Sequence, residues 1–367
     1  MLNFLPVTVD DRARRAVAWW LLLTCLLIAG MVVVGGATRL TDSGLSITEW
    51  KPVTGIVPPL SHADWVAEFT KYKTIPEYEL VNKGMSLAAF KSIYWWEWSH
   101  RFLGRMIGFA FFLPLVYFFV TKQVARSLAP RLILMFILGG AQGALGWFMV
   151  KSGLSDRVDV SQYRLAAHLG TAFLIYGYIF WVALDLLFNR EGRPPAPSER
   201  VSTRLYRAGL VTVALIYLQI FLGAFVAGLH AGRSYNTWPL MDSGFVPRGY
   251  FFLSPWVRNF FENIATVQFN HRLVGYLIFI STMTLFAMAR KATLAPAVRT
   301  ALWGLGAVVL LQVILGIATL LEVVPLGLAL AHQAGALAAF TAGLAFVQTV
   351  RHVRAGDAQM ATAFAAP

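Results

Sequence analysis

Apolar residues fill eight stretches of this chain, and each stretch is long enough to cross a lipid bilayer as a helix. A helix rises about 1.5 Å per residue, so roughly 20 apolar residues cover a hydrocarbon core of about 30 Å. Because helices of this length satisfy their backbone hydrogen bonds inside lipid, the pattern predicts an all-α integral membrane protein with eight transmembrane helices. The predicted spans are residues 16–38, 102–121, 131–150, 165–188, 205–228, 271–289, 300–321 and 326–349.

Polar and small residues recur along these stretches in the same order in both halves of the chain. The matching segments are His100-Arg101-Phe102-Leu103-Gly104 with His271-Arg272-Leu273-Val274-Gly275, Gln142-Gly143-Ala144-Leu145-Gly146 with Gln312-Val313-Ile314-Leu315-Gly316, and Ala167-His168 with Ala331-His332. An even number of helices per repeat leaves the two halves parallel in the membrane. We therefore predict two parallel pseudo-repeated four-helix bundles, residues 1–188 and 204–367, joined by a proline-rich cytoplasmic linker at 189–203.

The net charge of +13 does not point to a nucleic-acid partner, because the chain is 57% hydrophobic and its basic residues flank the predicted spans. A raw count of basic residues on the two faces does not decide the orientation. The inner loops are short and dense in basic residues, however, and Arg12, Arg14 and Arg15 precede the first span, which predicts cytoplasmic N- and C-termini. The first span is too long for the apolar part of a signal peptide, so we predict a bacterial inner membrane.

The loop at residues 39–97 is long enough to carry structure of its own. Ser61, followed three residues later by Asp64, is typical of a helix start, and so is Ser86 before an aromatic run. Aromatic faces of this kind suit a membrane surface, and a lid over a site in the first half is the alternative. The second outer loop, 229–267, would cover the second half.

Any redox role must come from a cofactor, because Cys25 is the only cysteine and lies inside the first predicted span. Four histidines, His100, His168, His271 and His332, lie near the starts of the even-numbered spans and at one depth. Ionisable residues within the membrane are costly, and paired histidines on facing helices commonly hold heme. Zinc is less favoured, because no cysteine or carboxylate cluster accompanies the pairs.

The neighbours of two histidines suit a large flat ligand. Gly104 and Gly275 each follow a histidine by four residues, on the same helix face, where they would leave room for a macrocycle or for close helix packing. Arg101 and Arg272 could pair with heme propionates or reach toward the membrane surface.

Glu97 breaks the match between the halves, since Gln268 stands at the equivalent place. Glu97 lies three residues before His100, on the same helix face, so a carboxylate accompanies only the first histidine pair. This asymmetry favours chemistry in the first half and electron delivery or storage in the second. An ion pair between Glu97 and Arg101 is the structural alternative.

Taken together, these motifs resemble the heme A synthase family over nearly the whole chain. The resemblance is carried by Gly35-Gly36-Ala37-Thr38-Arg39-Leu40-Thr41, Ser43-Gly44-Leu45-Ser46, Trp50-Lys51-Pro52-Val53-Thr54-Gly55, Tyr72-Lys73, Pro76-Glu77-Tyr78, Glu97-x-x-His100-Arg101, Asn236-Thr237-Trp238-Pro239-Leu240-Met241, Gln268-Phe269-Asn270-His271-Arg272 and His332-Gln333. Some members carry a cysteine pair in the first outer loop. This chain has no such pair and therefore resembles the alphaproteobacterial and mitochondrial-type branch.

The resemblance implies oxidation of a ring methyl of heme O to a formyl group, through a hydroxymethyl intermediate, to give heme A for cytochrome c oxidase. It also implies that His271 and His332 ligate a heme B cofactor, that His100 and His168 receive heme O, and that Glu97 is an essential carboxylate. Membrane lipid surrounds the chain. Heme O synthase, assembly factors of cytochrome c oxidase and a second copy of the chain are the candidate partners.

Two other classes of protein remain as alternatives on the residues alone. A bis-histidine membrane cytochrome that only transfers electrons would have two similar heme sites and no role for Glu97. A transporter built on internal repeats would have broken helices with polar groups at the midplane, whereas the polar groups here gather near one end.

Overall fold

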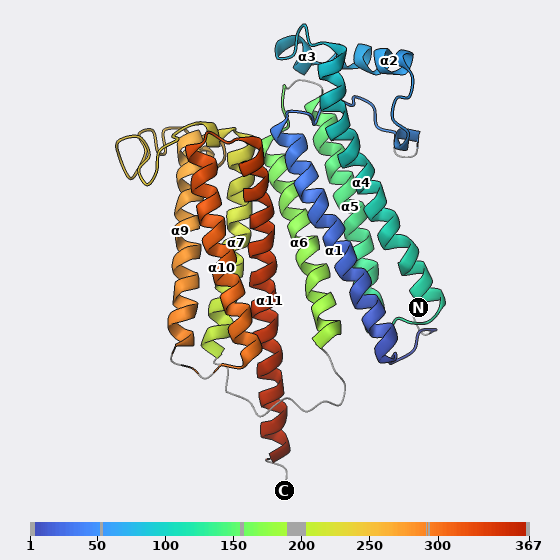
Figure 1. The fold of residues 1–367 in the computed structure, drawn as a ribbon, viewed down its shortest axis with the longest axis vertical. Helices are drawn as coiled ribbons and strands as arrows, with labels where there is room; N and C mark the ends of the chain where they lie inside the picture. The colour runs from blue at the N-terminus through green and yellow to red at the C-terminus, as the bar shows by residue number, and fades with distance from the viewer. Residues whose placement is uncertain are drawn as a thin grey trace.

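The fold is a bundle of long, nearly parallel and antiparallel helices, seen in a computed structural model that describes residues 4–51, 54–154, 158–188, 203–290, 292 and 294–364 (Figure 1). Eight helices in these segments are long and apolar enough to cross a membrane. They are α1 (Asp11–Leu40), α4 (Leu87–Val120), α5 (Ala129–Gly153), α6 (Gln162–Phe188), α7 (Thr203–Gly228), α9 (Ile264–Ala289), α10 (Pro296–Leu321) and α11 (Leu326–Phe364). The predictions of an all-α class and of eight spans are confirmed.

The helices stand in two groups of four, with α1, α4, α5 and α6 on one side and α7, α9, α10 and α11 on the other (Figure 1). Within the first group, α1 lies toward the centre of the bundle and α5 lies outside. In an apolar stretch of 18 residues, 44% of α1 is buried, against 6% of α5. The outer helices turn large apolar side chains outward, as a lipid-facing surface requires. The predicted linker 189–203 lies outside the described residues, apart from Thr203 at the start of α7.

Local sequence sets where several helices begin. The side chain of Asp10 accepts a hydrogen bond from the backbone N–H of Ala13 and so caps α1. Asn263 caps α9 in the same way, through Ala265 and Thr266. Proline at the first positions of α5 and α10 begins those helices, because its missing N–H would have no helical partner there.

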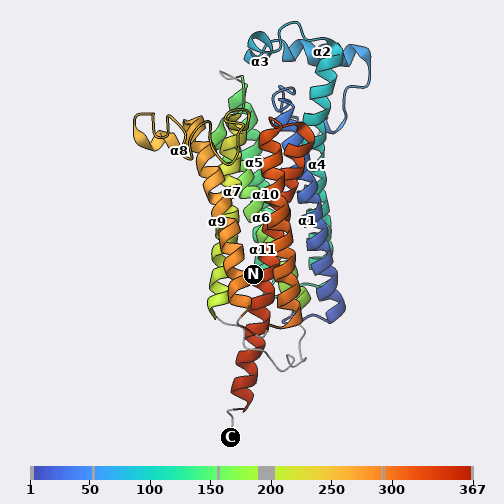
Figure 2. The ribbon, with the colours of Figure 1, turned by 60° about the vertical axis from the view of Figure 1, so that its left-hand side comes forward.

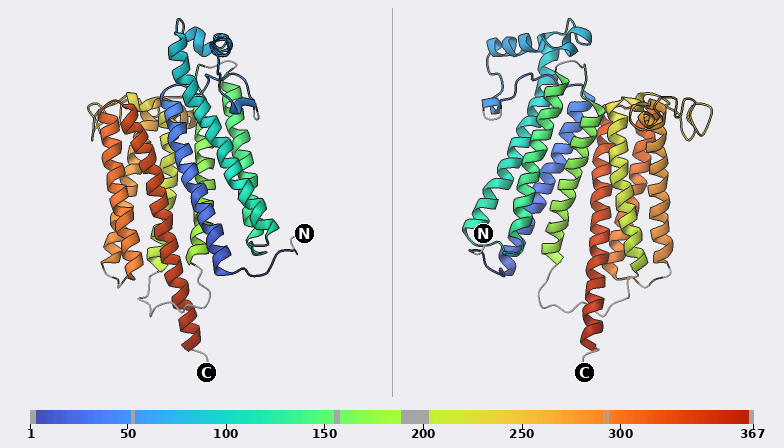
Figure 3. Two further views of the ribbon diagram at one scale, coloured as in Figure 1. Left: turned by 45° about the vertical axis from the view of Figure 1, so that its right-hand side comes forward. Right: turned by 180° about the vertical axis from the view of Figure 1, so that it is seen from behind.

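Both long loops lie at one end of the bundle, here termed the loop end, while α1 begins and α11 ends at the other (Figures 1 and 2). The first loop carries η1 (Thr54–Ile56), α2 (His62–Tyr72) and α3 (Pro76–Leu80). The second carries η2 (Ala231–Arg233), η3 (Trp256–Arg258) and α8 (Asn259–Glu262). At the opposite end α11 extends well beyond its neighbours (Figure 3).

The first loop is shorter than predicted, because α4 begins at Leu87 rather than near residue 102. Ser86 does cap a helix, and Ser61 forms a capping box with Asp64, as the sequence predicted. The Ser86 helix is not a separate surface segment, however. It continues through Glu97 and His100 into the membrane span, and α2 packs against its extended end (Figure 2).

Aromatic residues of α2 pack against those of α4, while Trp95 stays 42% exposed. Trp65, Phe69 and Tyr72 of α2 are buried against Phe90 and Tyr94 of α4. The Phe69 and Phe90 rings stack with centroids 4.9 Å apart. Buried aromatic area of this kind gives α2 a small core of its own above the span.

Candidate functional site

Each of the four histidines lies against a glycine of the preceding membrane helix. A Cβ added to that glycine would approach the imidazole to about 3 Å in every case, closer than ordinary contact. The pairs and distances are Gly35 with His100 (3.0 Å), Gly146 with His168 (2.9 Å), Gly223 with His271 (3.2 Å) and Gly316 with His332 (2.9 Å). A side chain at any of these positions would therefore push a ring from its place.

Three of the four histidines are also held from the same neighbouring helix by a glutamine one turn from the glycine. Its side-chain amide donates to the backbone carbonyl of the histidine. The bonds run from Gln142 to His168 (2.8 Å), from Gln219 to His271 (2.9 Å) and from Gln312 to His332 (2.9 Å). Two of these glutamines stood in the matched segments and Gly35 in a family motif. Gln219 and Gly223 were missed, and so was the contact of Gly35 with His100. The Gln-x-x-x-Gly spacing was the signal that would have found Gln219 and Gly223.

The geometry of His271 and His332 fits a heme iron between them. Their ring centroids lie 6.4 Å apart at an interplanar angle of 79°. Two metal–nitrogen bonds of about 2 Å, plus about 1.1 Å from each nitrogen to its ring centre, separate two axial imidazoles by about 6 Å. The Nδ1 atoms of both rings are buried without a hydrogen-bond partner among the described residues, whereas Nε2 of His271 lies 3.3 Å from the side-chain nitrogen of Gln219.

Glu97 is fully engaged as an acceptor of hydrogen bonds. Its side chain is buried, with 2% of the residue exposed. One carboxylate oxygen accepts from the Ser46 hydroxyl at 2.8 Å and from the Ile47 backbone N–H at 2.6 Å. The other pairs with the Arg101 guanidinium at 2.5 Å, so the ion pair foreseen as the structural alternative is present. Three groups thus hold the carboxyl group in place from α4 and the first loop.

Gln268 holds the second loop by the same means but with the direction of the bonds reversed. Its amide N–H group donates to the carbonyls of Ala231 at 2.8 Å and Ser234 at 2.5 Å, and its oxygen accepts from Arg272 at 3.1 Å. The loop after α1 thus presents donors to residue 97, whereas the loop after α7 presents acceptors to residue 268. Each loop therefore has the side chain that satisfies it.

The two arginines beside the histidines are also bonded to these loops. Arg101 donates to the carbonyls of Ile47 (2.7 Å) and Glu49 (2.9 Å), and Arg272 donates to those of Tyr235 (2.6 Å) and Thr237 (2.8 Å). Pairing of either arginine with heme propionates stays a prediction.

The two glycines predicted to leave room for a macrocycle lie at close helix contacts. A Cβ on Gly104 would lie 3.2 Å from the Met31 side chain of α1, and one on Gly275 would lie 3.4 Å from that of Gln219 on α7. These contacts fit the close packing that the sequence left as the alternative.

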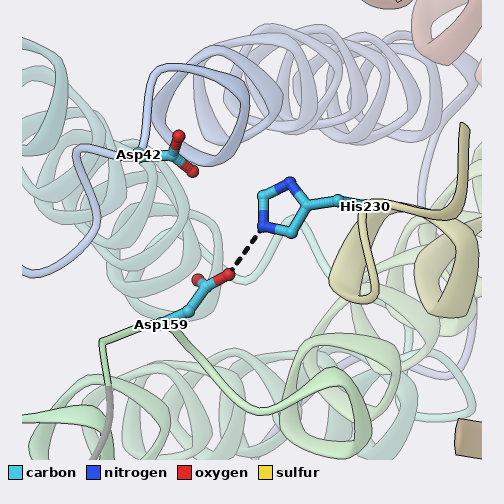
Figure 4. A group of neighbouring side chains, drawn as sticks. All are labelled: Asp42, Asp159 and His230. Atoms are coloured by element: carbon cyan, nitrogen blue, oxygen red, sulfur yellow. Dashed lines mark hydrogen bonds and ion pairs between the residues drawn. The ribbon is translucent and has the colours of Figure 1, made fainter. Parts of the chain in front are cut away.

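An ion-pair network that the sequence analysis missed joins the two groups of helices at the loop end. Asp42, Asp159 and His230 place their ligand atoms within 4.8 Å of one another, and Asp159 lies 2.9 Å from the His230 ring (Figure 4). Arg39 lies 2.9 Å from each of the three. Its guanidinium fills the place that a cation would take. The network therefore ties the end of α1 to the loops before α6 and after α7.

Glu77, on α3, lines a cavity beside this network. The cavity measures about 30 Å³, enough for one or two water molecules, and Thr38, Arg39, Asp42 and Asp159 also line it. Glu77 is 3% exposed, and its Oε2 atom has no hydrogen-bond partner among the described residues. Burial, and then the nearby charges of Glu97, Asp42 and Asp159, raise the pKa of Glu77 to about 8.

The raised pKa of Glu77 predicts that the first loop becomes less stable as pH rises. Between about pH 4.5 and pH 8, folded Glu77 holds a proton that the unfolded chain has lost, so the free energy of unfolding falls across this window and is lowest above it. Glu77→Gln should remove most of this dependence. Proteolysis of the loop at pH 6 and pH 9 measures it, with Glu79→Gln, an exposed neighbour on α3, as the control. Equal pH dependence in both variants would contradict the assignment.

Known proteins match this chain over most of its length. The family described as cytochrome oxidase assembly protein matches residues 18–344. A protein of Parvibaculum lavamentivorans named heme A synthase is 54% identical over 92% of this chain and 96% of its own length. Heme A synthases of Nitrosospira multiformis and Bradyrhizobium diazoefficiens are 51% and 52% identical, over 93% and 94% of this chain and 95% and 94% of their own lengths.

Proposed function

Because this chain belongs to the cytochrome oxidase assembly protein family, in which its relatives at about 50% identity are heme A synthases, we propose how it converts heme O to heme A. The chain is an oxidoreductase that acts on heme O, with the activity of a heme A synthase. One ring methyl is oxidised to a formyl group through a hydroxymethyl intermediate. Counted with one water molecule as the source of the formyl oxygen, the change releases four protons and four electrons, and an external acceptor takes up the electrons. The product serves cytochrome c oxidase.

The two histidine pairs have different roles, one for the cofactor and one for the substrate. His271 and His332 hold heme B, and their ring separation of 6.4 Å supports this. Heme B bound there supplies one-electron transfer. His100 and His168 receive heme O as substrate, and the farnesyl tail explains a site within the bilayer, since each buried CH₂ favours lipid by about 0.8 kcal/mol. Gly104 and Gly275 would border the two sites, and Arg101 and Arg272 would supply positive charge for the heme propionates.

Glu97 is the carboxylate of the substrate half. It lies one turn before His100 on α4, and its three donors hold it in place beside the site. An anchored carboxylate can accept a proton as the methyl group is oxidised or stabilise a cation that forms there. The amide of Gln268 can do neither, so the second half lacks this chemistry.

We further propose that this multi-pass membrane protein lies in a bacterial inner membrane with both termini in the cytoplasm. The loop end then faces away from the cytoplasm, and both heme sites lie near that face. Heme O synthase would deliver the substrate, assembly factors of cytochrome c oxidase would accept the product, and a second copy of the chain is a candidate partner.

The observation that carries the proposal is the set of four histidines, each held against a glycine at the same end of the bundle. To test it, the purified chain loaded with heme B is supplied with heme O, an electron acceptor and air, and its pigments are extracted and separated. Heme A should appear with the wild type and not with His100→Ala. Return of unchanged heme O from fully loaded wild type would point to a cytochrome that only transfers electrons.

Cys25 should not matter to this reaction. The thiol is 4% exposed within α1 and lies 3.9 Å from the carbonyl of Tyr176. A lone buried thiol cannot form a disulfide relay within one chain, so Cys25→Ser should give heme A near the wild-type yield, with a stability cost of about 1 kcal/mol. Loss of activity with normal heme content would contradict this and indicate a direct role for the thiol.

A further inference from the structure

One histidine departs from the pattern that holds the other three. His168, His271 and His332 each receive a side-chain amide bond on the backbone carbonyl from a glutamine four residues before the glycine that touches the ring. On α1, four residues before Gly35, the residue is Met31. A thioether cannot donate a hydrogen bond, so α1 lacks the amide that ties the other histidine-bearing helices to their neighbours.

Met31 meets α4 through a soft contact instead. Gly104 lies one turn after His100 on α4, and a Cβ added to it would lie 3.2 Å from the Cε atom of Met31. Methionine has three rotatable bonds and adapts to changes in its surroundings at little cost, whereas a glutamine bonded to a carbonyl fixes both helices. At Gly35, α1 therefore offers the His100 carbonyl no amide donor, and the nearest bond between the two helices is one turn away, from the Thr38 hydroxyl to the Trp96 carbonyl at 3.2 Å.

Heme O is assigned to the half that contains Met31, and this assignment suggests a role for methionine in place of glutamine. A resident heme B should stay bound, but substrate must enter and product must leave in every turnover. On that proposed function, we propose that Met31 makes His100 the exchangeable ligand, so that heme O and heme A pass in and out beside α1. Gln219 and Gln312 keep the heme of the second half in place. Met31 is thus a positioning residue for ligand exchange and takes no part in the oxidation.

A reciprocal exchange of side chains tests this with heme dissociation as the readout, independent of turnover. Wild type, Met31→Gln and Gln219→Met are loaded with heme B and heme O in detergent micelles and mixed with excess apomyoglobin. Extraction and chromatography then give the rate at which each heme is lost. Met31→Leu, which also lacks a donor and has similar volume, is the matched control.

In the wild type, heme O should leave faster than heme B. Met31→Gln should slow the loss of heme O by about threefold to tenfold, the range that one hydrogen bond supplies, and Gln219→Met should speed the loss of heme B by a similar factor. Met31→Leu should match the wild type.

An unchanged rate of heme O loss in Met31→Gln would overturn the inference. If Met31→Gln fails to fold, an unchanged rate of heme B loss in Gln219→Met would overturn it instead. Faster loss of heme B than of heme O from the wild type would instead overturn the proposed division between the halves.

Discussion

Glu97→Gln is expected to lower the yield of heme A by at least about 100-fold, the effect typical of a lost acid–base group. Heme O should accumulate in extracts, with some of the hydroxymethyl product, while heme B in the second half survives. Glu97→Gln should also weaken the hydrogen bonds that hold the first loop. Ser46 and Ile47 both donate to Glu97, and Arg101 donates to its other oxygen, so an amide N–H group at this position must face a donor.

Ser46→Ala separates the chemical role of Glu97 from its role in holding the loop. This variant removes one hydrogen bond to the carboxylate, worth about 1 kcal/mol, and leaves the carboxylate and its ion pair in place. It should keep most of the activity. If Ser46→Ala lost heme A as completely as Glu97→Gln, the carboxylate would act through the loop alone. Loss of heme B in Glu97→Gln would contradict the division between the halves.

Replacing either His271 or His332 with Ala should remove most of the bound heme B and shift any remainder to a high-spin spectrum. Six-coordinate low-spin iron needs both axial imidazoles, and the two rings have the separation that such a pair requires. Absorption and electron paramagnetic resonance spectra of the purified variants measure the change, with His100→Ala as the control that should keep low-spin heme B. Full low-spin heme in both variants would rule out this ligand pair.

The membrane spans were predictable because lipid imposes a simple requirement of length and apolarity on each helix. The start of α4 was not, because Glu97, His100 and Arg101 lower the hydropathy of a segment that is still helical. Glu97 and Arg101 have hydrogen-bond partners in the first loop. A pattern read along one helix does not contain those partners.

The four histidines could be found from the sequence because ionisable residues at one depth of a membrane protein are rare. Their supporting contacts could not, since the approach of Gly35 to His100 or of Gly223 to His271 depends on the relative register of two helices. The network of Arg39 with Asp159 and His230 joins residues far apart in the chain, so it too required the fold.

A cryo-electron microscopy structure of the chain loaded with both heme B and heme O tests the division between the halves most directly. The farnesyl tail distinguishes the two hemes in the density. The account predicts the farnesylated heme between His100 and His168 and the tail-free heme between His271 and His332. Farnesyl density between His271 and His332, with heme B in the first half, would contradict it.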